Sequence, residues 1–159
     1  MNDFKYEIDD SEVTITGYTG AGHGDVVVPA EIDGLPVTTI RNYAFEYRTR
    51  LTSITLGKSI TTIKRGAFEG CSGLTSITLP NSITTIGDEA FRGCTSLTSI
   101  TLPNSLTAIG NGAFSGCTGL TSITLPDSIT TIGDFAFSGC TGLAPRTRDA
   151  IALVRRGAS

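Results

Sequence analysis

Hydrophobic residues recur along this chain at a fixed step of 23 residues, and polar or glycine-rich stretches separate them. Four residue types keep the step, in the same order within each unit. They are Phe45, Phe68, Phe91, Phe114 and Phe137; Leu51, Leu74, Leu97, Leu120 and Leu143; Ile40, Ile63, Ile86, Ile109 and Ile132; and Cys71, Cys94, Cys117 and Cys140. A fixed period of this length predicts stacked coils that share one continuous core.

One unit, LTSITLPNSLTAIGNGAFSGCTG at residues 97–119, shows how a coil is built. Ile100 and Leu102 alternate with polar residues, which predicts a half-buried strand. A turn rich in proline, asparagine and serine follows, and then a second short extended stretch at residues 106–109. Gly110 permits a sharp bend, and a short helical or 3₁₀ turn would bring Phe114 into the core. The predicted fold class is a repeat solenoid with one parallel β-sheet face.

The unit resembles the BspA-type class of leucine-rich repeats, whose pattern is LxxIxLPxxIxxIxxxAFxxCxx. The resemblance covers about residues 26–143, most of the chain. It departs at Arg48, which occupies the first cysteine position, and at Gly57-Lys58, which replaces Pro-Asn in one turn. After Leu143 the pattern stops. The resemblance implies a leucine-rich-repeat stack with short strands and 3₁₀ or helical turns.

The pattern divides the chain into three segments. Residues 1–40 are expected to form an N-terminal β cap and an irregular first repeat, with a β-hairpin around the turn at residues 9–11. Residues 41–143 carry the BspA-type repeats, and residues 144–159 form a non-repeat C-terminal cap or tail. A cap is needed because the apolar ladder of a solenoid would otherwise meet water at its end.

The tail has the signals of a short helix. Asp149 is a candidate N-cap, an apolar interior follows, and Arg155-Arg156 and Gly157 end the segment. Two interpretations remain open for a native tail. The helix covers the last coil, or it pairs two copies of the chain into a homodimer through their C-terminal ends.

Charge limits the partners of the chain. The formal net charge is −3, which does not suggest a nucleic-acid partner. The charge is −6 up to Ala144 and +3 from Pro145 to Ser159. No apolar run approaches the ~20 residues of a membrane span. The first ten residues lack the pattern of a signal peptide, so the protein is cytosolic or a leader lies outside this sequence.

Candidate chemistry is sparse, and the sequence predicts neither an enzyme nor a cofactor or metal site. The four cysteines stand in a line, one per coil, without the close CxxC spacing of metal ligands, so we expect buried free thiols. His23, the single histidine, lies in the glycine-rich segment 20–25, and nothing in the sequence suggests a nucleophile beside it. We expect it to be a solvated loop histidine.

The outer rows of the repeated strand form the first candidate binding face. In each LTSITL segment the middle polar residues point away from the core. The face comprises Ser53, Thr55, Ser76, Thr78, Ser99, Thr101, Ser122 and Thr124. These residues are also ordinary β-formers that tolerate water, so the pattern alone leaves both interpretations open.

A second candidate patch lies where the repeats differ from one another. Its residues are Arg41, Tyr43, Tyr47, Arg48 and Arg50. Tyrosine and arginine are favoured anchors at protein interfaces.

Three functions remain open. The resemblance implies a secreted or cell-surface protein that adheres to host matrix proteins or to other cells. Near-identical repeats with unusual ends also suit a self-assembling structural unit, a homo-oligomer joined through its ends. A more remote hypothesis is that the regular Ser/Thr rows match an ordered lattice such as ice.

Overall fold

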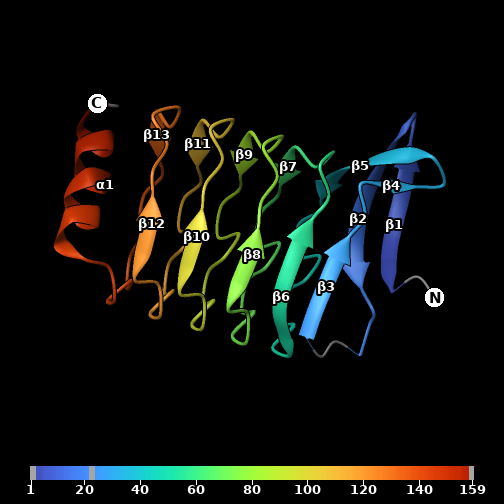
Figure 1. Cartoon of the computed structure of the whole chain (residues 1–159), viewed down its shortest axis with the longest axis horizontal. Helices are drawn as coiled ribbons and strands as arrows, with labels where there is room; N and C mark the ends of the chain where they lie inside the picture. Colours follow the sequence, from blue (N-terminus) through green and yellow to red (C-terminus); the bar gives the residue numbers. More distant parts are fainter. Residues whose placement is uncertain (1–2, 22–23, 158–159) are drawn as a thin grey trace.

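The coils stack side by side into a straight-sided solenoid. A computed structural model describes residues 3–21 and 24–157 of the chain. Figure 1 shows the repeated strands next to one another along the long axis, with the N-terminus at one end and a helix at the other. The predicted fold class is confirmed.

The strands that open the coils lie side by side in parallel on one face of the solenoid, which we call the front sheet. Its strands are β3 (Gly24–Val28), β6 (Leu51–Leu56), β8 (Ser76–Thr78), β10 (Ser99–Thr101) and β12 (Ser122–Thr124). Pairing runs through β3, β6 and β8, and again between β10 and β12. Equivalent residues pair across coils, such as Ile54 with Ile77. Residues that are 23 positions apart in the sequence therefore lie opposite each other on these paired strands.

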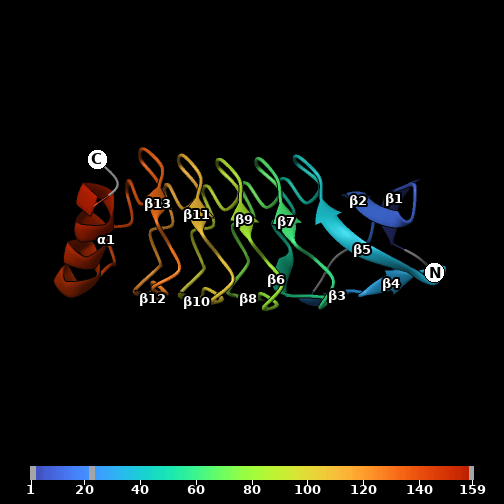
Figure 2. The same cartoon turned by 90° about the horizontal axis from the view of Figure 1, so that it is seen from above.

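The second extended stretch of each coil forms a sheet of its own, which the sequence pattern did not predict. This back sheet contains β1 (Phe4–Asp9), β2 (Glu12–Tyr18), β4 (Glu31–Ile32), β5 (Leu35–Ile40), β7 (Thr62–Ile63), β9 (Thr85–Ile86), β11 (Ala108–Ile109) and β13 (Thr131–Ile132). Figure 2 shows its strands stacked opposite the front sheet. Two sheet faces therefore bound the core; the repeat strands pair in parallel on both, and the pairs β1–β2 and β4–β5 are antiparallel.

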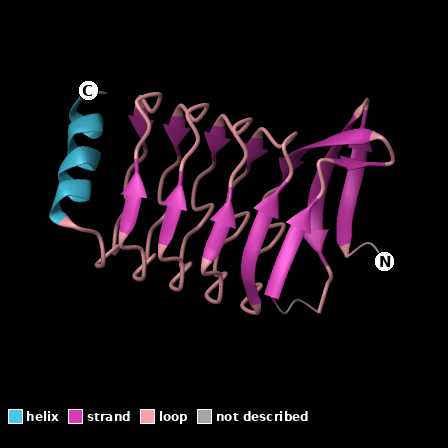
Figure 3. Ribbon diagram, viewed as in Figure 1, coloured by secondary structure: helices cyan, strands magenta, loops and turns pink. Residues whose placement is uncertain are grey.

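A third wall of hydrogen-bonded turns closes each coil. Phe114 N–H donates to the carbonyl oxygen of Ala136 in the next coil at 2.7 Å, and Gly116 N–H donates to Ser138 at 2.7 Å. Within the coil, Ser115 N–H donates to the carbonyl oxygen of Gly112 at 3.0 Å. The expected helical turn is therefore a series of separate turns, drawn as loop in Figure 3, because alternate amides bond to the neighbouring coil.

Phenylalanine side chains stack through the core of the solenoid. Rings of successive coils lie 5.1 to 5.3 Å apart between centroids, and Tyr18 extends the stack by packing 5.5 Å from Phe45. The four rings from Phe45 to Phe114 are fully buried. Removing such a side chain from water and packing it against two neighbours stabilises every coil through the coils beside it.

One position of the turn wall alternates between a large residue and glycine. Tyr43, Gly66, Glu89, Gly112 and Phe135 are 23 residues apart, and all have φ between +53° and +62°, the left-handed region. A Cβ atom at Gly66 would lie 2.3 Å from the ring of Tyr43, and one at Gly112 would lie 3.4 Å from Cγ of Glu89. Each large side chain therefore extends over the glycine of the following coil.

The two ends of the stack are closed differently. At the N-terminal end, β1 and β2 form the expected antiparallel hairpin, with Asp9 opposite Glu12. At the C-terminal end, α1 (Pro145–Gly157) packs against β12 and β13 and buries Ile151. The helix begins at Pro145, four residues before Asp149, so the expected N-cap at Asp149 is wrong. Proline suits the first turn of a helix, where its missing N–H costs no hydrogen bond.

Candidate functional site

The front sheet places the predicted Ser/Thr rows on one exposed surface. Ile and Leu side chains of its strands point inward and are buried, while the residues between them face water. Two rows run across the strands, one of serines and one of threonines. The paired members are Ser53 with Ser76, Thr55 with Thr78, Ser99 with Ser122, and Thr101 with Thr124. All are exposed except the half-buried Ser53.

The hydroxyl groups of the rows differ in whether they already have a protein partner. Ser53 Oγ donates to a carboxylate oxygen of Asp25 on β3. The threonines that precede the rows are also engaged, since Thr75 Oγ1 donates to the carbonyl oxygen of Thr52 at 2.9 Å. In the described part of the chain, no side-chain hydrogen bond engages the hydroxyls of the threonine row, at Thr55, Thr78, Thr101 and Thr124. These four hydroxyls are free to bond a ligand.

The threonine row borders a depression at the downstream end of the strands. Its volume is about 260 Å³. Thr101 and Thr124 line one side, and Pro103, Pro126 and Asn104 of the following turns line another. The strands β6, β8, β10 and β12 carry no charged side chain. The face is thus polar, uncharged and hollowed between coils, which suits hydrogen bonding to a broad partner surface.

The structure brings together only part of the second candidate patch. Tyr47, Arg48 and Arg50 line a cavity of about 130 Å³, together with Tyr18. Arg41 does not line it, because its guanidinium forms an ion pair with Glu7 at 3.0 Å.

Tyr43 stands apart from this cavity as well. The residue is 41% exposed, and its ring lies over Gly66 on the turn wall. No sequence signal identifies Tyr18 as part of the cavity, since only the position of the cap places it there.

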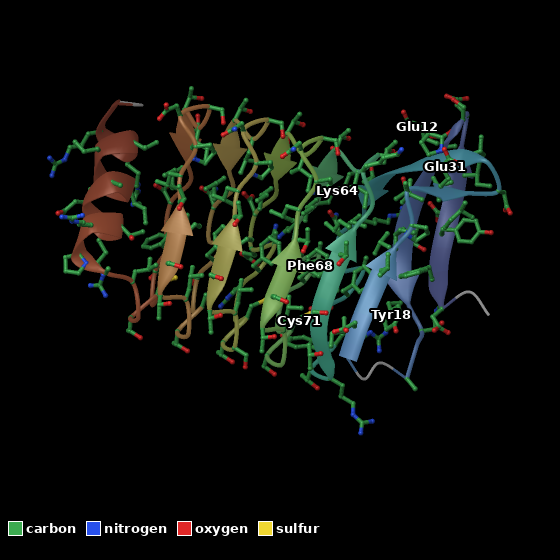
Figure 4. The ribbon with its side chains drawn as sticks, viewed as in Figure 1. Glu12, Tyr18, Glu31, Lys64, Phe68 and Cys71 are labelled. Atoms are coloured by element: carbon green, nitrogen blue, oxygen red, sulfur yellow. The ribbon has the colours of Figure 1, made fainter. Side chains whose placement is uncertain are left out.

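The four cysteines lie inside the stack and are free thiols. Each Sγ–H donates to a phenylalanine carbonyl oxygen of the preceding coil, as Cys71 does to Phe45 at 3.0 Å. Figure 4 labels Cys71 beside Phe68. Burial raises the pKa of Cys71 and Cys117 to about 12 and that of Cys140 to about 11, and it also raises the pKa of Cys94. Thiols held neutral in this way are poor nucleophiles.

Other candidate chemistry finds no site among the described residues. No three His, Cys, Asp or Glu side chains of residues 3–21 and 24–157 gather as a metal centre requires. The described chain also holds no helix with the length and apolar character that a membrane crossing needs. His23, expected to be a solvated loop histidine, lies outside the described residues.

One polar position of the turns bonds to the backbone of the next coil. The backbone N–H of Asn111 donates to Oδ1 of Asp88 at 2.8 Å, and the N–H of Asp134 donates to Oδ1 of Asn111 at 2.8 Å. Asp88 and Asn111 therefore cap the backbone of the following coil, whereas the carboxylate of Asp134 pairs with Arg155 at 3.1 Å. The 23-residue spacing of 88, 111 and 134 is the signal that identifies this position of the coil.

Coils with an inward Leu/Ile ladder, a parallel front sheet and a polar outer face define a leucine-rich-repeat solenoid. A sequence model of the BspA type Leucine rich repeat region matches residues 37–146 in six copies. This match covers well over half of the chain, so the chain belongs to the BspA-type leucine-rich-repeat family. No curated protein matches the chain.

Solved structures of bacterial proteins share the architecture. The leucine-rich-repeat protein TpLRR of T. pallidum matches with a TM-score of 0.87 and 39% identity, over 89% of this chain and 67% of that one. A leucine-rich cell surface protein of Faecalibacterium prausnitzii matches with a TM-score of 0.66 and 27% identity, over 91% of this chain and 52% of that one. The pneumococcal vaccine antigen PcpA matches with a TM-score of 0.68 and 25% identity, over 90% of this chain and 41% of that one. This chain spans about half the length of the last two proteins.

Proposed function

We propose that the chain is a protein-binding module of an adhesion protein, secreted or displayed at a cell surface, and that it binds through the front sheet. One observation carries the proposal. The threonine row at Thr55, Thr78, Thr101 and Thr124 presents hydroxyls without side-chain hydrogen-bonding partners among the described residues, on four strands that carry no charged side chain. Extended solenoid faces of this kind are used to bind proteins.

The relatives support the proposed location and role. One is described as a cell surface protein and another as a vaccine antigen, which is a molecule that a host encounters. Both share the fold with this chain and are about twice its length. The partner is proposed to be a host matrix protein or a cell-surface protein.

Binding of the purified chain to immobilised matrix proteins and to whole cells tests the proposal. The key variant carries Thr78→Lys and Thr101→Lys, which place two charges on the threonine row. The matched control carries Thr85→Lys and Thr131→Lys on β9 and β13, which are exposed threonines of the back sheet. Circular dichroism checks that both variants keep the fold.

The expected result is at least tenfold weaker binding for the front-sheet variant, equivalent to about 1.4 kcal/mol, and unchanged binding for the control. Equal binding by both variants would place the contact elsewhere on the molecule. No binding to any of the proteins or cells would contradict adhesion for this chain.

Self-assembly through the ends is the second candidate function, and the distribution of charge favours it. Residues 3–33 carry eight acidic side chains against the single Lys5, a net charge of −7. The helix α1 carries four arginines and Asp149, a net charge of +3. These segments lie at opposite ends of the solenoid (Figure 2), so the basic end of one copy faces the acidic end of another in a head-to-tail contact.

Light scattering over a range of protein concentrations tests this second function. The expected mass rises with concentration at low salt and returns to that of the monomer at about 0.5 M salt, where screening shortens the range of charge attraction to a few ångström. Arg146→Glu should lower the mass at low salt, whereas Arg92→Glu in the middle of the stack should not. A monomer at every concentration would exclude head-to-tail assembly.

A further inference from the structure

The first complete coil replaces the small residues of the later coils with large basic and aromatic ones. Tyr47, Arg48 and Arg50 stand where the next coil has Gly70, Cys71 and Gly73, and the later coils have glycine, cysteine, and glycine or serine. Three of four successive positions therefore depart from the repeat at one place.

Packing explains why the later coils carry small residues at these positions. A Cβ atom at Gly73 would lie 2.2 Å from the carbonyl oxygen of Thr49 in the preceding coil, and one at Gly119 would lie 2.5 Å from that of Thr95. The coil before Arg50 is the irregular cap, which leaves this space open. Arg48 and Arg50 are exposed, whereas Cys71 is buried by the coil in front of it.

The open space is a cavity with hydrogen-bond donors around it. It measures about 130 Å³ and is lined by Tyr18, Gly20, Tyr47, Arg48, Thr49 and Arg50. The ring of Tyr18 forms an aromatic wall, stacked on Phe45 at 5.5 Å. A Cβ atom at Gly20 would lie 2.2 Å from the Tyr18 hydroxyl, so glycine is required where the chain passes over this group.

The charges at the cavity are not balanced by neighbouring acids. Within residues 3–21 and 24–157, neither Arg48 nor Arg50 forms an ion pair, unlike Arg41, Arg65, Arg92 and Arg155. Burial raises the pKa of the Tyr18 phenol most, the carboxylate of Asp3 raises it further, and the guanidinium of Arg48 lowers it. Two guanidiniums against one carboxylate leave the cavity positive.

We propose that this cavity receives a carboxylate side chain of a protein partner, held by the guanidiniums of Arg48 and Arg50 and by the hydroxyl of Tyr18. A guanidinium binds a carboxylate through two parallel N–H donors, and a phenol adds a third donor. The volume lies below the ~300 Å³ at which pockets for whole small molecules begin, so a single acidic side chain is the occupant that fits. The site lies apart from the threonine row and stands independently of it.

A nuclear magnetic resonance titration tests the cavity without knowledge of the partner. The probe is acetyl-aspartyl-amide, added to the isotope-labelled chain, and the comparison probe is the neutral acetyl-asparaginyl-amide. We expect saturable shifts of the amides of Gly20, Thr49 and Leu51 with the aspartyl probe alone, at low-millimolar Kd. Such weak binding is the affinity that one exposed, charge-assisted contact supports.

Three variants decide between this site and general attraction of anions. Arg48→Gln with Arg50→Gln should weaken binding at least fivefold, and Tyr18→Phe should weaken it about twofold, whereas Arg92→Gln should bind as the unchanged chain does. Unshifted signals from the coils beyond residue 97 will show that the variants remain folded. Equal shifts with both probes, or binding retained by the double arginine variant, would overturn the proposal.

Discussion

Phe91 occupies the centre of the aromatic stack, 5.3 Å from Phe68 on one side and 5.2 Å from Phe114 on the other. Replacement by alanine removes both contacts and leaves a cavity between two coils. We expect Phe91→Ala to lower the free energy of unfolding by about 3–5 kcal/mol. Urea denaturation followed by circular dichroism measures the loss.

Phe137→Ala is the matched control, because Phe137 is partly buried and stacks on Phe114 alone within the ladder. A smaller loss at Phe137 than at Phe91 is expected. Equal losses would mean that stacking on two sides contributes nothing beyond burial of the ring.

The buried thiols give the protein a dependence on pH. Their ordinary pKa is about 8.5, and burial raises it to about 12 at Cys71 and Cys117 and to about 11 at Cys140. Below about pH 8.5 the thiols are neutral in both states, and stability is full. As the pH rises from there toward 11–12, the unfolded chain ionises first, so folding loses up to about 1.4 kcal/mol per pH unit for each thiol.

Urea denaturation at about pH 7.5 and about pH 10 measures this loss. Cys94→Ala removes one of the four groups and should reduce the difference between the two pH values. A stability that stays constant between them would show that the thiols are accessible to water in the folded chain.

The C-terminal helix α1 covers the apolar end of the last coil. Ile151 is its buried residue, and it lines a cavity of about 250 Å³ with Cys140 and Leu143. We expect Ile151→Asp to undock α1 and to expose Cys140 to alkylation before the other three cysteines. Mass spectrometry of iodoacetamide-treated protein identifies the modified thiol.

Leu153→Asp on the same helix is the control, since Leu153 is 66% exposed and should tolerate the charge. Equal protection of Cys140 in the Ile151→Asp variant would show that the coil is closed without the helix.

Local sequence predicted the elements whose residues carry their own signal. The hairpin and the opening strand of each coil follow from alternation, and the buried Phe and Cys ladders follow from the 23-residue step. The back sheet did not follow, because a two-residue strand such as β7 is defined by its neighbours in adjacent coils and not by its own pattern. The predicted start of α1 was wrong because both residues carry a helix-start signal: Asp149 can cap a helix, and Pro145 can occupy its first turn.

The candidate site was predicted in part for the same reason. The threonine row is a direct product of strand alternation, so every residue of the row lies on the expected face. The cavity at Arg48 combines residues of two segments, and its wall at Tyr18 depends on how the cap folds against the first coil. No local sequence pattern indicates how the cap packs against the first coil.

For the whole molecule, the alternation of large residues and glycine on the turn wall restricts how many coils the stack can gain or lose. Removing residues 66–88 takes out one coil and sets Tyr43 against Glu89, where a Cβ atom would meet the tyrosine ring. Removing residues 66–111 takes out two coils and sets Tyr43 against Gly112. We expect the shorter chain to have the higher melting temperature by calorimetry. The coil number is then expected to change in pairs, in steps of 46 residues, twice the visible repeat.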